Sequence, residues 1–136
     1  MTGLVLKLGP GERILINGAV IENGDRRTRL NIVSPHANIL RLKDAIHPDD
    51  VTTPVRRVCY LAQLILAGDA DPAEARKQLL VGIEQLSQVF LDRDSRNCLA
   101  EATAAVTERQ YYHALKALRG LLPRESRLLA TLDEPT

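Results

Sequence analysis

The chain is poor in aromatic side chains: its 136 residues include one phenylalanine, three tyrosines and no tryptophan. RNA-binding domains that stack bases on a sheet need aromatic rings on the sheet surface, so this composition argues against that mode of recognition. Cysteine is scarce too, with only Cys59 and Cys98. Both fall in helical patterns without a Cys-x-x-Cys motif, so we expect buried thiols and predict no disulfide, metal or cofactor.

Long apolar runs are also missing. No segment approaches the roughly 18 apolar residues that a membrane span requires. The first residues, Met-Thr-Gly-Leu, show no basic segment followed by an apolar one, as a signal peptide would. We therefore expect a cytoplasmic protein that does not bind membranes.

The chain has little net charge, at +1, but the charge is unevenly distributed. Basic residues exceed acidic ones in residues 1–57, and acidic residues exceed basic ones in residues 58–136. A typical nucleic-acid-binding domain is more basic than this. Any binding of nucleic acid should therefore be selective or assisted by oligomerisation.

The first part of the chain has the pattern of a small antiparallel meander. Asn17-Gly18 and Asn23-Gly24 supply the positive φ angles that tight hairpin turns require. Short apolar or alternating segments surround them, and Ser34-Pro35 interrupts the series. We expect five strands, at residues 4–8, 13–16, 19–22, 27–33 and 38–42.

The periodicity changes to that of helices after a Pro-rich linker. Thr53-Pro54 is a helix start, and the acidic and capping residues of 71–74 repeat the signal. A third helix should begin near Asp94 and a fourth, opened by a capping box at 107–110, should run to Pro123 before a frayed tail. The prediction is an α+β fold: a meander of about five strands, then a bundle of about four helices. The two units, residues 1–47 and 48–136, should form one folded domain.

No motif indicates catalysis. Gly9-Pro10-Gly11 superficially suggests a phosphate-binding loop but lacks the Lys-Ser/Thr and the following helix of a P-loop, so a hairpin loop is the better interpretation. The three histidines, at positions 36, 47 and 113, lack a second ligand at metal spacing, and Asp49 and Asp50 beside His47 are more often solvated linker residues than an acid/base cluster. We expect a protein that is not an enzyme.

A set of basic residues in the β-rich part is the one candidate binding site. Arg27 and Arg29 should share one face of their strand, opposite Leu30 and Ile32. Scattered basic residues are often only a soluble surface, but such a face could also clamp phosphates and reach the unpaired bases of an RNA loop. The candidate RNA-binding residues are Arg26, Arg27, Arg29, Arg41 and Lys43, with Lys7 and Arg13 as outliers.

The segment 111–119 suggests a second surface. Leu115, Leu118 and Leu122 form an apolar stripe, which leaves Tyr111, Lys116 and Arg119 on the outside of the expected helix. Such a helix is more often a core element with a solvated face than a docking surface. The three outward residues are the candidate partner-binding set.

Separated motifs follow one another along the chain, at residues 17–27 (NGAVIENGDRR), 39–44 (ILRLKD), 51–54 (VTTP) and 111–119 (YYHALKALR). Together they resemble the FlbT family of flagellum biosynthesis repressors, and the resemblance covers about residues 4–123. It implies a post-transcriptional repressor that associates with the 5′ untranslated region of flagellin mRNA and promotes decay of the message. The implied partner is the flagellin mRNA leader.

The first 46 residues are also similar to the carbon storage regulator CsrA, a small translational repressor. Five strands interlace between two chains in that family, and basic residues on the first and last strands hold the RNA loop. The matching positions here are Lys7 and either Arg41 or Lys43, whereas Leu8 and Leu42 stand where arginine would be expected. The resemblance and the open edges of short strands both predict a dimer formed through the β-rich part.

A function of another class remains open. A cytoplasmic adaptor could bind flagellin or another flagellar regulatory or assembly protein through its helical part and so regulate expression indirectly. The low net charge and the few aromatic residues favour the adaptor, whereas the arginine-bearing strands favour RNA.

Overall fold

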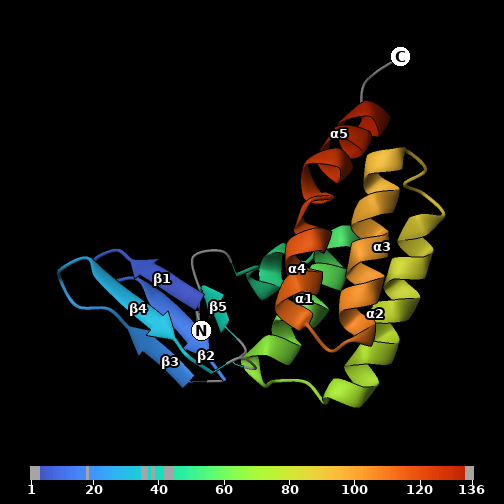
Figure 1. The fold of residues 1–136 in the computed structure, drawn as a ribbon. Helices are drawn as coiled ribbons and strands as arrows, with labels where there is room; N and C mark the ends of the chain where they lie inside the picture. Colours follow the sequence, from blue (N-terminus) through green and yellow to red (C-terminus); the bar gives the residue numbers. More distant parts are fainter. Residues whose placement is uncertain (1–3, 18, 35–36, 38, 42–44, 134–136) are drawn as a thin grey trace.

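The computed structural model describes residues 4–17, 19–34, 37, 39–41 and 45–133. Strands come first and helices second, which confirms the predicted α+β architecture (Figure 1). The strands are β1 (Leu4–Leu8), β2 (Arg13–Ile16), β3 (Ala19–Glu22), β4 (Thr28–Ile32) and β5 (Ile39–Arg41). After a short 3-10 turn, η2 (Pro48–Asp50), follow α1 (Pro54–Ala67), α2 (Pro72–Ser87), α3 (Arg93–Thr107), α4 (Tyr111–Arg119) and α5 (Leu122–Asp133).

The described strands form two small antiparallel sheets. One pairs β1 with β4, and the other has the order β3-β2-β5. Asn17, in the turn between β2 and β3, has a φ of 50°, as the Asn-Gly pattern predicts. Strand β2 is therefore the centre of the larger sheet, and β3 lies at its edge.

The central strand pair separates two apolar cores. Ile14 and Ile39 point toward Leu6 and Leu8 of β1 in a small core between the two sheets. Leu40 faces the other way and is buried in the large core formed by the helices. The alternation of side chains along a strand thus places the β3-β2-β5 sheet between the β1-β4 sheet and the helices.

Helix α1 is the axis of the helical part. Thr53 caps its first turn by accepting a 3.3 Å hydrogen bond from the backbone N–H of Arg56, and Gly68 ends it in a left-handed conformation with a φ of 80°. A close approach brings α2 against it at Gly82, where an added Cβ would lie 2.8 Å from the side chain of Val58. None of the described helices is long and apolar enough to cross a bilayer.

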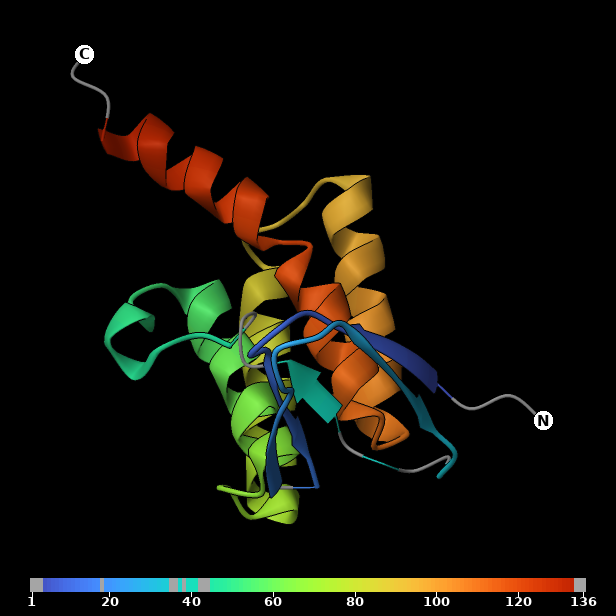
Figure 2. The same cartoon turned by 90° about the vertical axis from the view of Figure 1, so that its left-hand side faces the viewer.

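The C-terminal helices differ from the prediction. Helix α4 ends at Arg119, and the segment expected to fray forms α5, in which Pro123 occupies the first turn, where a missing N–H is tolerated. The expected capping box is also wrong, because Thr107 is the last residue of α3, and Gln110 caps α4 without a side-chain hydrogen bond. Helix α5 leaves the bundle and extends away from it (Figure 2).

Candidate nucleic-acid interface

A groove on the sheet part collects four of the predicted RNA-binding residues. Its volume is about 610 Å³, and it lies where β1 ends, β4 begins and β5 passes. Four of its lining side chains are cationic and one, Glu12, is anionic. The lining residues are Lys7, Leu8, Gly9, Glu12, Arg27, Thr28, Arg29 and Arg41. We call this feature the basic groove.

Two cations face each other across the strands of the basic groove. Lys7 and Arg29 are directly paired in the register of β1 and β4, and both side chains are exposed. Their neighbours Leu6, Leu8 and Leu30 turn toward the small core, which leaves these two on the outer face. Like charges directly opposite each other destabilise a strand pair, and a bound anion would relieve that repulsion.

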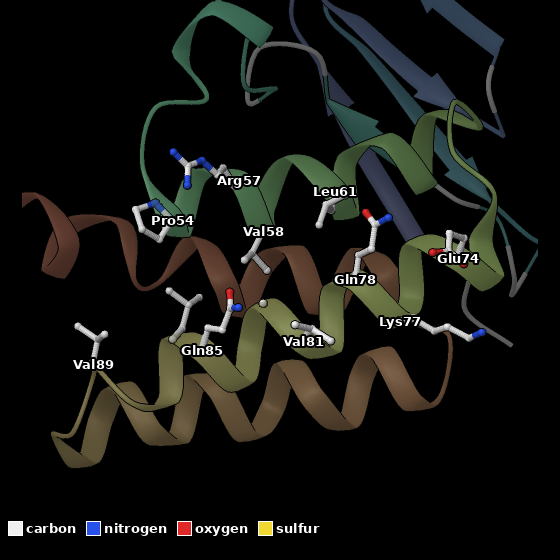
Figure 3. A pocket seen from close by; sticks show the side chains of 12 residues that line it. Pro54, Arg57, Val58, Leu61, Glu74, Lys77, Gln78, Val81, Gln85 and Val89 are labelled. Carbon is white, nitrogen blue, oxygen red and sulfur yellow. The ribbon is translucent and has the colours of Figure 1, made fainter.

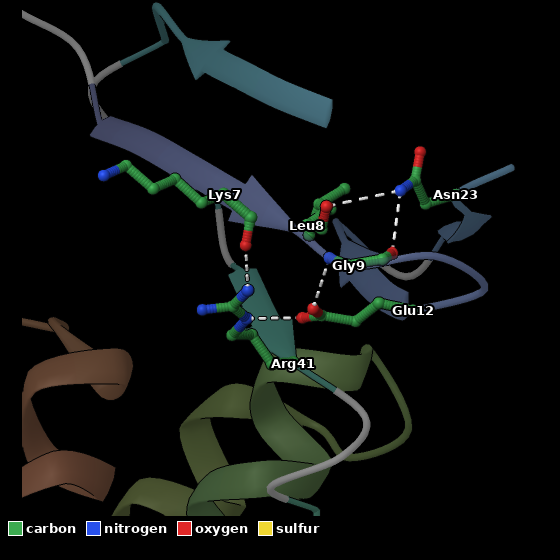
Figure 4. A network of polar contacts seen from close by, with 6 residues as sticks. All are labelled: Lys7, Leu8, Gly9, Glu12, Asn23 and Arg41. Atoms are coloured by element: carbon green, nitrogen blue, oxygen red, sulfur yellow. Dashed lines mark hydrogen bonds and ion pairs between the residues drawn. The ribbon is translucent and has the colours of Figure 1, made fainter. Parts of the chain in front are cut away.

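Arg41 forms the wall of the groove and is held by two hydrogen bonds (Figure 4). Its Nε donates to Glu12 Oε2 at 2.7 Å, and its Nη2 donates to the backbone carbonyl of Lys7. The second oxygen of the Glu12 carboxylate accepts from the backbone N–H of Gly9 at 3.0 Å. The side chains of Arg41 and Glu12 are only 24% and 12% exposed. Arg41 therefore joins the two sheets and offers less of its charge to a ligand than Lys7, Arg27 or Arg29 does.

The remaining predicted RNA-binding residues lie elsewhere. Arg26 is exposed in the turn between β3 and β4 and does not line the basic groove. Arg13 lies on β2 and forms an exposed ion pair of 2.9 Å with Glu22 across the strands. Lys43 falls outside the described residues. The structure thus brings together Lys7, Arg27, Arg29 and Arg41, including one residue that the sequence ranked only as an outlier.

The prediction that Tyr111 is exposed is wrong. Tyr111 is 7% exposed and belongs to the large core, whereas Lys116 is exposed and Arg119 is half-buried. A spacing of four residues places Tyr111 on the same helix face as Leu115. The sequence signal for this burial is the four-residue spacing from Tyr111 to Leu115, whereas Leu122 belongs to the next helix, α5. The exposed tyrosine of α4 is Tyr112.

A second concavity lies in the helical part (Figure 3). It is a cleft of about 590 Å³ between α1 and α2, and its walls are largely aliphatic, with Val58, Val81 and Val89 among them. Glu74 and Lys77 lie toward the end where α2 begins. The apolar part of this lining is typical of a groove that packs against another apolar surface.

Reactive groups are few in the described part of the chain. Cys59 is fully buried, and burial raises the pKa of its thiol to about 12, so it is a poor nucleophile. No group of three or more His, Cys, Asp or Glu residues among those described could hold a metal ion. Among the described residues, the basic groove gathers four cationic side chains, and its charge is of the sign that attracts an anion.

The fold and the basic groove define a small α+β protein with a cationic surface on its sheets. A family model described as "Flagellar protein FlbT" matches residues 4–129. The chain belongs to the FlbT family, which confirms the resemblance seen in its sequence motifs.

Curated relatives support the same assignment. The chain is 32% identical over 127 residues to the "Flagellum biosynthesis repressor protein FlbT" of Caulobacter vibrioides, covering 93% of this chain and 89% of the relative. It is 31% identical over 126 residues to the probable repressor of Caulobacter sp. (strain K31), covering 93% and 95%. It is 32% identical over 130 residues to that of Brucella anthropi, covering 96% and 84%. No solved structure matches the chain.

Proposed function

We propose that this protein represses flagellin synthesis after transcription, by associating with the 5′ untranslated region of flagellin mRNA and promoting its decay. The relatives named as flagellum biosynthesis repressors support the repressor role. The observation that carries the RNA-binding step is the pairing of Lys7 with Arg29 in the basic groove, with Arg27 beside them. An RNA phosphate is an anion that would relieve the repulsion between the paired cations.

The composition of the groove favours contacts to phosphates over contacts to stacked bases. None of the described residues that line it is aromatic, so these residues supply no ring on which a base could stack. Arginine guanidinium groups bind phosphate oxygens through two parallel hydrogen bonds, which fixes the position of the strand. An RNA loop presents such phosphates together with unpaired base edges, which the same arginines can reach.

The direct experiment is a binding titration of the purified full chain with a flagellin leader RNA and with a shuffled RNA of equal length. We expect tighter binding to the leader and a linear fall of log affinity with log salt concentration. Neutralisation of three phosphates by Lys7, Arg27 and Arg29 predicts a slope near −2 for single-stranded RNA, at roughly 0.7 per phosphate. Equal affinity for both RNAs, or none, would argue against the proposal.

The second candidate function is an adaptor that binds flagellin or another flagellar assembly protein through the helical part. The aliphatic cleft between α1 and α2 favours it, since a groove of that kind suits an amphipathic helix. Lys116 and Arg119 on α4 remain candidate contacts, but Tyr111 does not because it is buried. Capture of purified flagellin, without any binding of leader RNA, would replace the RNA hypothesis with this one.

We also propose that the protein forms a homodimer through the edge strand β3. All four residues of β3 are exposed. Val20 is 60% exposed and Ile21 is 38% exposed, and these two side chains point to opposite faces of the sheet. A second copy of β3, placed antiparallel about a two-fold axis, would continue the hydrogen-bond ladder and place a partner side chain beside Val20 on one face and beside Ile21 on the other. Sedimentation at micromolar concentration should give a dimer mass that Val20→Lys reduces to a monomer, and a monomeric parent would contradict the dimer.

A further inference from the structure

The side chain of Asn23 ties the loop that carries Arg26 and Arg27 to the end of β1, and the carbonyl of Arg26 also accepts a 3.2 Å hydrogen bond from Oγ1 of the nearby Thr28. The Asn23 Nδ2 donates to the carbonyl of Gly9 at 2.7 Å and to the carbonyl of Arg26 at 2.9 Å, with a longer contact of 3.4 Å to the carbonyl of Leu8. Figure 4 shows the amide reaching the end of β1 from the loop that follows β3. Asn23 thus connects the start of the loop, the end of β1 and the residue before Arg27.

The backbone of Asn23 is fixed independently of this side chain. Its N–H donates to the carbonyl of Glu12 at 2.8 Å, which continues the pairing of β2 with β3. The carbonyl of Gly24 accepts from Gly11 at 2.9 Å. Removing the Asn23 amide should therefore leave the β2-β3 hairpin in place and release mainly the segment beyond Gly24.

The bond to Arg26 has a direct consequence for Arg27. The carbonyl of Arg26 belongs to the same planar peptide unit as the nitrogen of Arg27, so fixing the carbonyl fixes where the Arg27 backbone begins. Arg27 lines the basic groove, but it precedes β4, so no strand pairing holds it. Arg29, in contrast, lies within β4 and is held by its register with Lys7.

We propose that Asn23 is a positioning residue for the basic groove and acts through Arg27. Its amide holds the peptide between Arg26 and Arg27 so that the Arg27 guanidinium faces the groove beside Lys7 and Arg29. A loop that is ordered before binding loses less conformational entropy when the ligand arrives. The inference rests on the proposed function, because the ligand in the groove is the leader RNA.

A double-mutant cycle tests the role. Asn23→Ala should weaken leader binding about tenfold in the parent protein. In an Arg27→Gln background the same change should weaken binding less than about twofold, because the guanidinium that Asn23 positions is then missing. The matched control is the same cycle with Arg29→Gln, where the two losses should multiply. Losses that multiply in both backgrounds would overturn the positioning role.

Two further measurements keep the test decisive. Thermal unfolding of each variant separates loss of fold from loss of position. Asn23→Asp replaces the N–H donor with an anionic oxygen that repels the carbonyls of Gly9 and Arg26, so it should weaken binding at least as much as Asn23→Ala. If the parent does not bind the leader RNA, the proposed function fails, and the cycle is repeated with inorganic tripolyphosphate. Coupling of Asn23 to Arg27 but not to Arg29 then still supports the positioning role, and multiplying losses overturn it.

Discussion

The side chain of Glu125 accepts a 2.8 Å hydrogen bond from the backbone N–H of Val55, seventy residues earlier in the chain. Glu125 is 6% exposed and lies in the first turn of α5, and Val55 lies in the first turn of α1. The first N–H groups of a helix lack partners within the helix and carry its positive dipole end. A buried carboxylate at this position therefore fastens α5 to α1.

Removing that carboxylate should destabilise the protein. Glu125→Ala leaves the buried N–H of Val55 without an acceptor, which we expect to lower the free energy of unfolding by about 1–3 kcal/mol. Glu125→Gln retains an acceptor oxygen and should cost less. Urea unfolding of the three proteins measures the difference, and equal losses for both variants would show that the hydrogen bond itself contributes little.

Tyr111 and Tyr112 are adjacent in sequence, but their truncation should destabilise the protein to very different extents. Tyr111 is 7% exposed in the large core, whereas Tyr112 is 40% exposed. Tyr111→Ala should therefore lower the free energy of unfolding by about 3 kcal/mol or more, as for other buried aromatic side chains, and Tyr112→Ala by about 0.5 kcal/mol or less. Similar losses for the two variants would contradict the observed placement of α4.

The two thiols should differ in reactivity. Burial raises the pKa of Cys59 from an ordinary value of 9.0 to about 12, while Cys98 is half-buried and lines a groove between α3 and α4. At pH 8 we expect a thiol reagent to modify Cys98 at least about a hundredfold faster than Cys59 in the native protein. In denaturant the reagent should modify both thiols. Equal rates in the native protein would contradict the burial of Cys59.

The same pKa shift implies a pH dependence of stability. The folded protein holds the Cys59 proton more tightly than the unfolded chain does. The stability that depends on this proton is therefore fully present below about pH 9 and is lost as the pH rises from 9 toward 12. Cys59→Ala should remove this part of the alkaline decline. The free energy of unfolding, measured from pH 8 to 11 in the parent and in Cys59→Ala, tests this prediction: it should fall more steeply above pH 9 in the parent.

The sheet part and the helical part should unfold together, as one domain. Leu40 of β5 is 1% exposed and lies in the core formed by the helices. Leu40→Ala should lower the free energy of unfolding by about 2–5 kcal/mol and shift the transitions of strands and helices equally. Two separate transitions in the parent protein would instead define residues 1–47 and 48–136 as independent units.

The local features of this fold were predictable from the sequence, and the long-range ones were not. The alternation of side chains along a strand predicts that Arg29 and Leu30 lie on opposite faces of β4, and Thr53-Pro54 predicts the start of α1. Each signal depends only on nearby residues. The two-sheet arrangement and the bond from Arg41 to the Lys7 carbonyl join residues that are distant in sequence, and no local pattern contains them. The basic groove was therefore predicted as a set of residues but not as a shape.

The C-terminal error has a different cause. Pro123 predicts a helix stop, but proline is tolerated in the first turn of a helix as well as after the last. Only the preceding break at Gly120 distinguishes the two cases, and it depends on how Leu121 and Glu125 are buried. Packing, which the sequence pattern does not contain, decided where α4 ended.

The most direct test of the RNA-binding groove is the salt dependence of leader binding by the Arg27→Ala/Arg29→Ala protein. Both side chains are exposed, so the fold should be retained. Loss of two phosphate contacts should weaken binding and reduce the slope of log affinity against log salt by about 1.4. An Arg93→Ala/Arg127→Ala protein, which loses two exposed charges from α3 and α5, should keep the parent slope. If the Arg27/Arg29 variant instead binds the leader with the affinity and slope of the parent, the RNA-binding surface is not the basic groove.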